Sequence, residues 1–354
     1  MVKLLILQNE LSAYNVPVYN IIAEQYDLTV GYYQKDKSKE ECKFTKKHFE
    51  TKTLGPLCFV KGLRKFAKDF DVVSIIPDMH VVSYCLIPFL PHSYKLTNWS
   101  IGFRVSYVHP YVTSRKHTLA DYVFKKIISH CDASIFYMEK AKEFWRGTNL
   151  VLKKVFVAPN TTKVQSIEVD PAKKKNFLFV GTLYKGKGLD LLLQAYKKAV
   201  DVASIDNELH IVGDGEERQS IEYYVKKNNL ESKVVLHGAI FDEVLLAQLF
   251  SEALLCISPT QGGLSCPKSM GYGVPFVTKT SAITGGEIYH ITPGVNGIMY
   301  QNDDELEGIL IEASQHPDKY LEMGSKAKEY YDNNATIYHM AKGAMAAFSY
   351  SLNR

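Results

Sequence analysis

The chain has 354 residues, of which 46% are hydrophobic and 23% charged. This composition is typical of an ordinary soluble globular protein, and the length is generous for one core and sufficient for two domains. The net charge of +4 conceals an asymmetry, because residues 1–165 carry 24 basic and 14 acidic side chains and the remainder carries 18 and 24. A basic first half indicates a polyanion or an anionic membrane surface as partner. The sequence has no recognisable nucleic-acid-binding motif, so nucleic acid is not expected as a partner.

The cysteines and the first residues indicate a cellular compartment. Six cysteines are scattered without a Cys-x-x-Cys pair or a Cys/His spacing that would hold a metal, which indicates reduced core residues and no metal site. The opening MVKLLILQNE predicts a strand rather than a secretion signal, because its apolar run is short and lacks a cleavage site. The longest apolar candidate for a membrane span, Val81–Leu90, is interrupted by Pro88. We therefore expect a cytoplasmic protein.

In the first half, short apolar runs alternate with amphipathic stretches, which is the pattern of a doubly wound parallel sheet. The predicted strands are Val2–Gln8, Leu28–Tyr33, Val72–Ile76, Lys95–Trp99, Ala133–Tyr137 and Val155–Ala158. The predicted helices are Pro17–Gln25, Lys61–Asp69, Thr118–His130 and Glu139–Trp145.

The second half repeats this rhythm after a polar, aperiodic linker at Thr161–Asn176. The predicted strands are Phe177–Val180, Leu209–Val212, Val234–Leu236, Leu254–Ile257 and Pro275–Thr278, and the predicted helices are Leu189–Val200, Glu216–Asn228, Asp242–Phe250 and Leu264–Met270. We predict two α/β domains, residues 1–165 and 166–335, and a C-terminal helix at 336–354 that could pack back on the first domain. Ligands of such sheets bind at the carboxyl ends of the strands, so both domains are expected to face a common cleft.

The strongest local pattern is FLFVGTLYKGKGLDLLLQAY, residues 177–196. Gly181–Lys187 fits the G-x-x-x-x-G-K loop of nucleotide triphosphatases, but Gly188 stands where that loop needs a hydroxyl for magnesium, which argues against an ATPase or GTPase. A lysine at the start of a helix is unfavourable for the helix dipole unless an anion binds there. We therefore prefer a phosphate-binding loop to the alternative, a structural glycine turn with solvated lysines.

Three further segments of the second half, APNTTK, LHIVGDGEER and VVLHGAI, complete a recognisable pattern. Together with the glycine loop they resemble the nucleotide-binding domain of the retaining glycosyltransferases of family 4, which have the GT-B fold. That family has Gly-Arg-Leu, three variable residues and Lys-Gly after a strand, and Thr182 stands here in place of the Arg. The resemblance covers about residues 155–300. The matching residues are Pro159, Asn160, Gly181, Leu183, Lys187, Gly188, Gly213 and Gly215.

The stretch ISPTQGGLSCPKSMGYGVP, residues 257–275, matches the family in its glycines and departs from it in its charges. The family has two Glu residues, separated by seven others, around a Gly-Leu turn and a Gly-x-Pro exit. Gly263–Leu264 and Gly273–Pro275 match, whereas Thr260 and Lys268 occupy the Glu positions, which in the family contact the donor sugar and the ribose. Lys268 could bind a phosphate or a ribose hydroxyl; the alternative is a solvated lysine.

The resemblance implies a nucleotide-sugar site in the second domain. Backbone amides at Gly263, Leu264 and Ser265 are expected to hold a diphosphate at the start of a helix. Glu287 is a candidate replacement for a missing carboxylate; the alternative is a solvated loop residue. The predicted nucleotide contacts are Gly181, Thr182, Lys187, Gly188, Gly213, Gly238, Ile240, Gly263, Leu264, Ser265 and Lys268.

The first domain is expected to bind the acceptor. In Val60–Phe70 one helical face is apolar and the rest carries Lys61, Arg64, Lys65 and Lys68, the profile of an interfacial helix on anionic lipid. The alternative is a helix that packs on the sheet with a solvated basic face. Such a basic surface would suit a lipid-linked pyrophosphate acceptor.

Polar residues that follow predicted strands are the acceptor and catalytic candidates of this domain. Asp78 could act on an acceptor hydroxyl and His80 could bind the donor sugar, although a histidine there can equally be structural. Arg104 is placed to meet a phosphate or carboxylate. Trp99 and Asn15 are the remaining candidate acceptor contacts.

These observations predict a metal-independent GT-B glycosyltransferase that moves a sugar from a UDP- or GDP-sugar to a saccharide or lipid-linked acceptor. Its pathway is expected to be cell-surface polysaccharide assembly (capsule, O-antigen, exopolysaccharide or lipopolysaccharide), on or near the cytoplasmic face of the inner membrane. Retention of anomeric configuration is implied by the resemblance alone. Two alternatives are a sugar-nucleotide epimerase on the same fold and a catalytically silent nucleotide-binding subunit.

Overall fold

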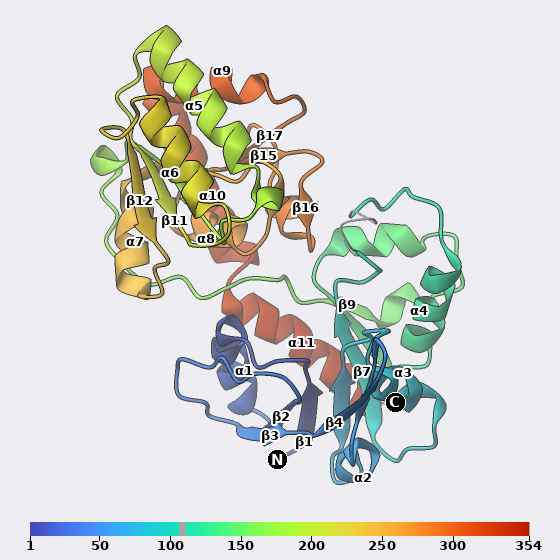
Figure 1. Cartoon of the computed structure of the whole chain (residues 1–354). Helices are drawn as coiled ribbons and strands as arrows, with labels where there is room; N and C mark the ends of the chain where they lie inside the picture. Colours follow the sequence, from blue (N-terminus) through green and yellow to red (C-terminus); the bar gives the residue numbers. More distant parts are fainter. Residues whose placement is uncertain (106–110, 354) are drawn as a thin grey trace. The chain divides into compact units, whose positions relative to one another are not determined.

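The computed structural model describes residues 1–105 and 111–353 and divides into two units. Unit 1 consists of Met1–Thr162 and Ile337–Arg354, and unit 2 of Lys163–Thr336. The chain thus leaves unit 1 once and returns to it with its last helix, α11 (Ile337–Leu352) (Figure 1).

Unit 1 is built on a seven-stranded parallel sheet in the order β3-β2-β1-β6-β7-β8-β9. Its strands are β1 (Lys3–Leu7), β2 (Asp27–Tyr32), β3 (Thr45–His48), β6 (Val72–Ile75), β7 (Lys95–Ser100), β8 (Ala133–Phe136) and β9 (Val155–Val157). Strand order reverses between β1 and β6, because the chain first builds outward through β2 and β3 and then resumes on the other side of β1. In such a sheet this reversal leaves a crevice at the carboxyl ends of the two strands.

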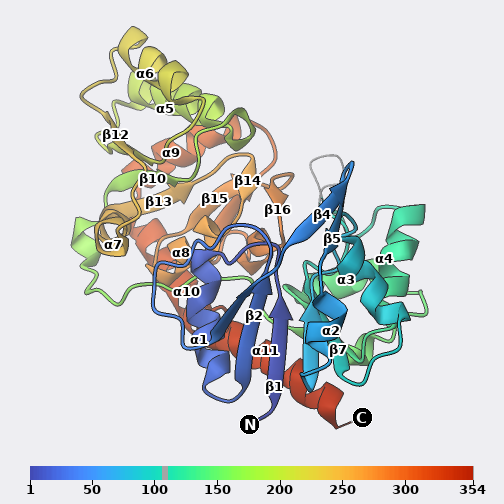
Figure 2. The same cartoon turned by 60° about the horizontal axis from the view of Figure 1, so that its bottom comes forward.

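Helices cover both faces of this sheet. On one face α1 (Val16–Ala23) and α11 share an apolar cluster with the strands, in which Ala341, Ala344 and Phe348 are fully buried. Small alanine side chains allow α11 to lie close against β7, β8 and β9. The other elements are α2 (Leu63–Ala67), α3 (Val82–Leu86), α4 (Leu119–Ser129) and an antiparallel hairpin of β4 (Thr51–Leu54) and β5 (Leu57–Val60), which stands out from the sheet in Figure 2.

Helix α2 decides between the two interpretations of the basic amphipathic segment. Leu63 and Ala67 are 3% and 0% exposed, and Phe66 and Phe70 pack against the same cluster, which also contains residues of β1 and β6. Lys61, Arg64, Lys65 and Lys68 are exposed. The helix therefore packs on the sheet with a solvated basic face, and the interfacial-helix interpretation is wrong because its apolar face is already covered by the unit's own core.

Unit 2 has a six-stranded parallel sheet in the order β12-β11-β10-β13-β15-β17. Its strands are β10 (Asn176–Val180), β11 (Leu209–Val212), β12 (Val234–Gly238), β13 (Ala253–Ile257), β15 (Phe276–Lys279) and β17 (Gly297–Tyr300). Residues of α5 (Leu189–Ala203), α6 (Arg218–Lys227) and α9 (Glu305–Gln315) enter the cluster on one face. Those of α7 (Glu243–Glu252), α8 (Ser265–Gly271) and α10 (Pro317–Asn334) enter the cluster on the other. Here strand order reverses between β10 and β13.

The structure adds elements that the sequence pattern did not predict. The basic segment at residues 34–52 contains edge strand β3, and the segment predicted as a helix at Glu139–Trp145 is a 3-10 helix. Two residue pairs, β14 (Gln261–Gly262) and β16 (Ile283–Thr284), form a small parallel ladder beside the main sheet of unit 2. Among the described residues, no helix is both long and apolar enough to cross a membrane.

Candidate functional site

Two loops meet at the strand reversal of unit 2. Residues 181–188 follow β10 and residues 258–263 follow β13, so both lie at the carboxyl edge where parallel sheets bind ligands. Thr260 Oγ1 donates a hydrogen bond of 2.7 Å to the carbonyl oxygen of Gly186, and the Tyr184 hydroxyl donates to Gln261 Oε1. The side chain of Thr260, at a predicted sugar-contact position, therefore fastens one loop to the other.

Glycines bring a third strand end against the first loop. Gly213 has φ of +151°, and a Cβ there would lie 1.8 Å from the carbonyl oxygen of Gly181. Gly215 has φ of +157°, and its Cβ would lie 2.2 Å from the carbonyl oxygen of Leu183. Only glycine permits this approach, since any side chain would displace the loop. The predicted Gly-x-Gly turn thus packs directly against the backbone of the Gly181–Gly188 loop.

Lys187 ends the 3-10 turn η6 (Lys185–Lys187), and Gly188, with φ of +68°, begins helix α5. Burial lowers the pKa of the Lys187 ammonium, and the charge of Glu287 acts in the opposite direction. The ammonium lies 5.9 Å from the centroid of the Tyr184 ring and forms no ion pair with the residues that the structure describes. A largely desolvated cation that has Glu287 nearby but no ion pair among the described residues, at a glycine loop, is suited to bind a phosphate.

Glu287 lies in the neighbourhood of Lys187, although 100 residues separate them in the sequence. It opens the 3-10 turn η7 (Glu287–His290) directly after β16, and pairing of β16 with β14 carries it to the loop that follows β13. Glu287 is 5% exposed, and its Oε2 accepts from Thr284 Oγ1 at 2.9 Å and from the Gly285 amide at 2.8 Å. The alternative of a solvated loop residue is thereby excluded, and a fixed carboxylate is available as a hydrogen-bond acceptor.

Lys268 is buried on α8, with only 10% of its side chain exposed. Its ammonium lies 2.5 Å from Oε2 of Glu243, the first residue of α7. The alternative of a solvated lysine is therefore wrong as well. The predicted direct contact of Lys268 with a ligand now has to compete with an existing ion pair.

The remaining predicted nucleotide contacts lie around the same sheet edge. Gly263 has no atom within 4 Å of the position of a Cβ, so its backbone is open on that side. Leu264 and Ser265 follow at the start of α8 and are partly exposed, and Thr182 is exposed. Gly238 has φ of +71° and accepts from the amide of Gly213 at 2.8 Å, which leads the chain on to Ile240.

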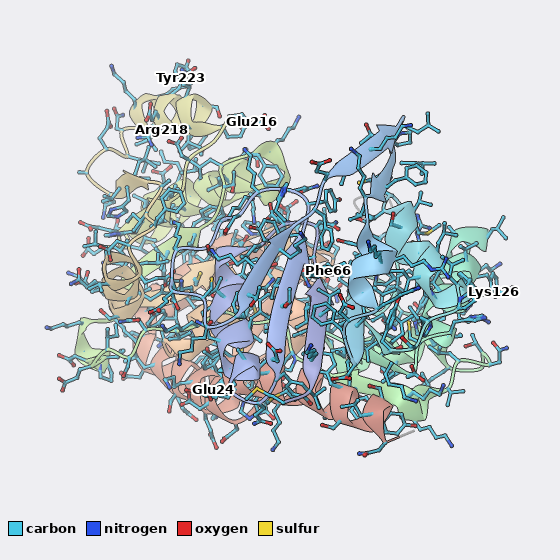
Figure 3. The ribbon with its side chains drawn as sticks, turned by 90° about the horizontal axis from the view of Figure 1, so that it is seen from below. Glu24, Phe66, Lys126, Glu216, Arg218 and Tyr223 are labelled. Carbon is cyan, nitrogen blue, oxygen red and sulfur yellow. The ribbon has the colours of Figure 1, made fainter. Side chains whose placement is uncertain are left out.

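Arg218 is a residue that sequence reasoning missed. It lies on α6, where Figure 3 labels it, and its Nη1 is 3.3 Å from the position of a Cβ on Gly238. Its Nε donates to Glu222 at 2.8 Å, and Nη1 lies 3.8 Å from Asp214. The sequence held one indication of Arg218, namely its position three residues after the Gly-x-Gly turn. Whether a side chain at that position points toward the strand ends depends on the rotation of the helix about its axis.

In unit 1 the strand reversal is occupied by a side-chain pair. Asn9, which follows β1, donates from Nδ2 to Oδ2 of Asp78, which follows β6, at 2.8 Å. The amide of His80 donates to Asp78 Oδ1 at 2.9 Å, while the His80 residue is exposed. Asn9 Oδ1 is buried and has no hydrogen-bond partner in the described part of the chain. The structure thus brings Asp78 and His80 together, and it adds Asn9.

Two of the acceptor candidates belong to the core instead. Trp99 is 3% exposed and its ring lies edge-on to Tyr19 with centroids 6.3 Å apart, because its position on β7 faces the cluster beneath α1 and α11. Asn15 is 6% exposed at the junction into α1. Neither side chain is presented to a ligand, so these two predictions are corrected. Arg104 is partly exposed, and its carbonyl oxygen accepts from Arg115 at 3.0 Å.

No group of three or more His, Cys, Asp or Glu side chains among the described residues is arranged to hold a metal ion. The six cysteines, all described, are free thiols and four of them are buried.

Part of unit 2 is similar in sequence to known proteins. Residues 174–314 match the model of the family described as Glycosyl transferases group 1. An uncharacterized glycosyltransferase of Methanocaldococcus jannaschii is 29% identical over 157 residues, 43% of this chain and 42% of that protein. The lipopolysaccharide 1,6-galactosyltransferase of Salmonella typhimurium is 24% identical over 180 residues, 49% of each chain. The chain thus spans about half the length of the curated relatives it matches.

The fold has a solved counterpart over nearly the whole chain. The HepE protein of Anabaena, solved in complex with UDP-glucose, aligns with a TM-score of 0.73 at 15% identity, covering 99% of this chain and all of that one. Residues 174–314 are therefore similar to the group 1 glycosyltransferases, and the chain has the GT-B fold that its sequence predicted.

Proposed function

We propose that the protein is a glycosyltransferase that takes a sugar from a nucleotide-diphosphate donor, UDP- or GDP-linked, and passes it to a saccharide or lipid-linked acceptor. The observation that carries this proposal is Lys187, a largely buried ammonium that forms no ion pair among the described residues, on a glycine loop at a strand reversal. An ammonium so placed binds the diphosphate and stabilises the charge that develops on it as the leaving group.

In this proposal, different residues at the carboxyl edge of the unit 2 sheet bind the different parts of the donor. The amides at Gly263, Leu264 and Ser265 assist Lys187 with the diphosphate, and the base lies near Gly238 and Ile240. The fixed carboxylate of Glu287 accepts hydrogen bonds from sugar hydroxyls. Transfer without a metal ion and with retention of configuration forms part of the proposal. The complex of HepE with UDP-glucose supports a nucleotide-sugar donor.

The acceptor is assigned to unit 1. Asp78, oriented by two hydrogen bonds, takes the proton of an acceptor hydroxyl. The exposed His80 binds the donor sugar, and the partly exposed Arg104 meets a phosphate or carboxylate of the acceptor. A pocket of about 530 Å³ between β3 and α2 is lined by three lysines and two carboxylates, among which Lys61 pairs with Glu50. We assign its remaining lysines, Lys47 and Lys65, to a lipid-linked pyrophosphate or to an anionic inner-membrane surface. The lipopolysaccharide galactosyltransferase among the relatives supports a role in cell-surface polysaccharide assembly at the cytoplasmic face of that membrane.

A second candidate, a nucleotide-binding subunit without catalysis, is favoured by one observation. Thr260 and Lys268, where the family resemblance implies two carboxylates, are engaged in a loop-fastening hydrogen bond and an ion pair. The epimerase alternative has no observation of its own in its favour.

The test is a thermal-shift screen of UDP- and GDP-sugars, followed by assays of transfer and donor hydrolysis with those that stabilise the protein. Transfer or hydrolysis with a bound nucleotide sugar supports the transferase. Binding without either reaction leaves the silent subunit, and the absence of any stabilisation contradicts both.

A further inference from the structure

We infer that Glu243 is the residue that accepts the ribose hydroxyls of the nucleotide, and that Lys268 positions its carboxylate. This inference rests on the proposed function, since it concerns the same nucleotide in unit 2. Lys268, the sequence candidate for a ribose hydroxyl, is engaged with Glu243, a residue that did not stand out in the sequence.

The ion pair between Lys268 and Glu243 is asymmetric. Only 10% of the Lys268 side chain is exposed, whereas 55% of the Glu243 side chain is exposed. The lysine is therefore the fixed member, anchored on a helix whose neighbours Cys266 and Met270 lie in the core. The carboxylate is held by one oxygen, Oε2, 2.5 Å from the ammonium, while the group as a whole still faces solvent.

Capping of helix α7 does not account for Glu243. The N-cap residue Asp242 already serves that purpose, because its Oδ1 accepts from the amides of Val244 at 2.8 Å and Leu245 at 3.2 Å. Glu243 also compensates the charge of the largely buried Lys268 ammonium, and it does so through one oxygen, Oε2. The lysine thus fixes the direction of a carboxylate that remains 55% exposed.

The position of the pair is the carboxyl edge of the sheet. Helix α7 starts a few residues after β12 and α8 starts a few residues after β13, and both pack on the same face through a common cluster. In the sheet, β11 and β10 lie between β12 and β13, and they end at Gly213 and Gly181. The Lys268–Glu243 pair therefore bridges two helix starts that flank the glycine turns of the candidate site.

Charge decides which part of the nucleotide can lie there. A carboxylate repels the diphosphate, which Lys187 attracts, so it has to meet a neutral part of the ligand that carries donors. A ribose offers two adjacent hydroxyls, and a carboxylate accepts several hydrogen bonds at once. The ammonium of Lys268 directs that carboxylate through Oε2 without using all of its acceptor positions.

The experiment compares a ribose with a ring that lacks its hydroxyls. Affinities of UDP and 2′,3′-dideoxy-UDP, and of the guanine pair, are measured calorimetrically for the wild type and for Glu243→Gln. We expect the wild type to prefer the ribose form by about 10-fold or more, the range for hydrogen bonds to a charged group. In Glu243→Gln that preference should fall to less than about 3-fold through weaker ribose binding, with dideoxy affinity unchanged. Glu252→Gln, an exposed glutamate at the other end of the same helix, is the matched control and should keep the wild-type preference.

Variants of Lys268 test its positioning role. Lys268→Arg keeps the ion pair and should retain the preference, whereas Lys268→Met should lose most of it at unchanged dideoxy affinity. The double exchange Glu243→Lys with Lys268→Glu returns a carboxylate to the pair and should restore part of it. A wild-type preference that persists in a folded Glu243→Gln protein overturns the inference and leaves the proposed function intact. If the wild type binds no nucleotide diphosphate at all, the proposed function falls, and this inference falls with it.

Discussion

The strand reversals of the two units differ in whether backbone or side chains line them. Between β10 and β13 in unit 2 the walls are largely backbone: glycines at positive φ admit carbonyl oxygens to within the space of a missing Cβ, and a single ammonium points into the loop. Between β1 and β6 in unit 1 the same place is held by side chains, the hydrogen-bonded pair of Asn9 and Asp78. Under the proposed function this difference has a reason, because a diphosphate is the same in every donor and suits a backbone cradle, whereas an acceptor varies and suits exchangeable side chains.

Gly213→Ala should give the largest effect, because it adds a side chain to the backbone-lined strand reversal of unit 2. The new Cβ would lie 1.8 Å from the Gly181 carbonyl oxygen at a φ that only glycine adopts readily. We expect a loss of about 4 kcal/mol or more in the free energy of unfolding of unit 2, the range of severe steric lesions, together with loss of nucleotide binding. Urea unfolding and calorimetry measure both. Gly308→Ala, on an exposed position of α9, is the control, since nothing lies within 4 Å of its Cβ position, and equal damage there would contradict this assignment.

The two units also differ in how a buried charged side chain is compensated. In unit 1 Arg115 is paired with the fully buried Asp121, which holds the pKa of that carboxyl well below its usual range. In unit 2 Lys174 is 7% exposed, and the partners of its ammonium among the described residues are three carbonyl oxygens, those of Phe250, Ala253 and Tyr272. Burial lowers its pKa from 10.5 to about 8.

Lys174 should therefore make the stability of unit 2 rise with pH. Between pH 8 and 10.5 the folded lysine is neutral while the unfolded one still binds a proton, so alkali favours the folded state. The free energy of unfolding of the wild type, minus that of Lys174→Met, should increase by about 3 kcal/mol over this range. Urea unfolding at several pH values measures the difference. Lys175→Met, an exposed neighbour, should show no such slope, and a flat difference for Lys174→Met would disprove the prediction.

Lys187→Ala tests the one side chain that the backbone cradle of unit 2 requires. Removal of the ammonium should weaken binding of UDP or GDP by about 1.5–3 kcal/mol, as for other hydrogen bonds to charged groups. Calorimetric titration gives the affinity directly. Lys185→Ala removes an exposed lysine from the same turn and should change the affinity far less. Unchanged nucleotide affinity in a folded Lys187→Ala protein would remove the diphosphate from this loop.

The same contrast explains how far the sequence could lead. The glycine loop, the Gly-x-Gly turn and Lys187 were predicted because a backbone cradle requires particular residues at fixed local spacing. Glu287 was named, but its closeness to Lys187 depends on the two-residue ladder of β14 and β16, which has no periodicity to detect. The partners Glu243 and Asn9 were missed because each pairs with a residue 25 or 69 positions away. Trp99 was misassigned because the end of a strand predicts an edge, and only packing shows that its ring faces the core.

Asn9→Ala probes the side-chain arrangement of unit 1 and should give the smallest effect. It removes a neutral donor that directs Asp78 but leaves the carboxylate and its bond from the His80 amide in place. We expect kcat/KM for the acceptor to fall by about 10-fold, equivalent to about 1.4 kcal/mol, mostly through kcat, because a base that is free to turn lies less often in line with the hydroxyl. The affinity for the nucleotide diphosphate should stay unchanged, since that site lies in unit 2.

Asn9→Asp sets a second carboxylate beside Asp78, and like charges favour the protonated form, so the lower limb of the pH–rate profile should move to higher pH. A merely structural asparagine would lower stability without moving that limb. Kinetics across pH with saturating donor therefore distinguish orientation of Asp78 from simple packing.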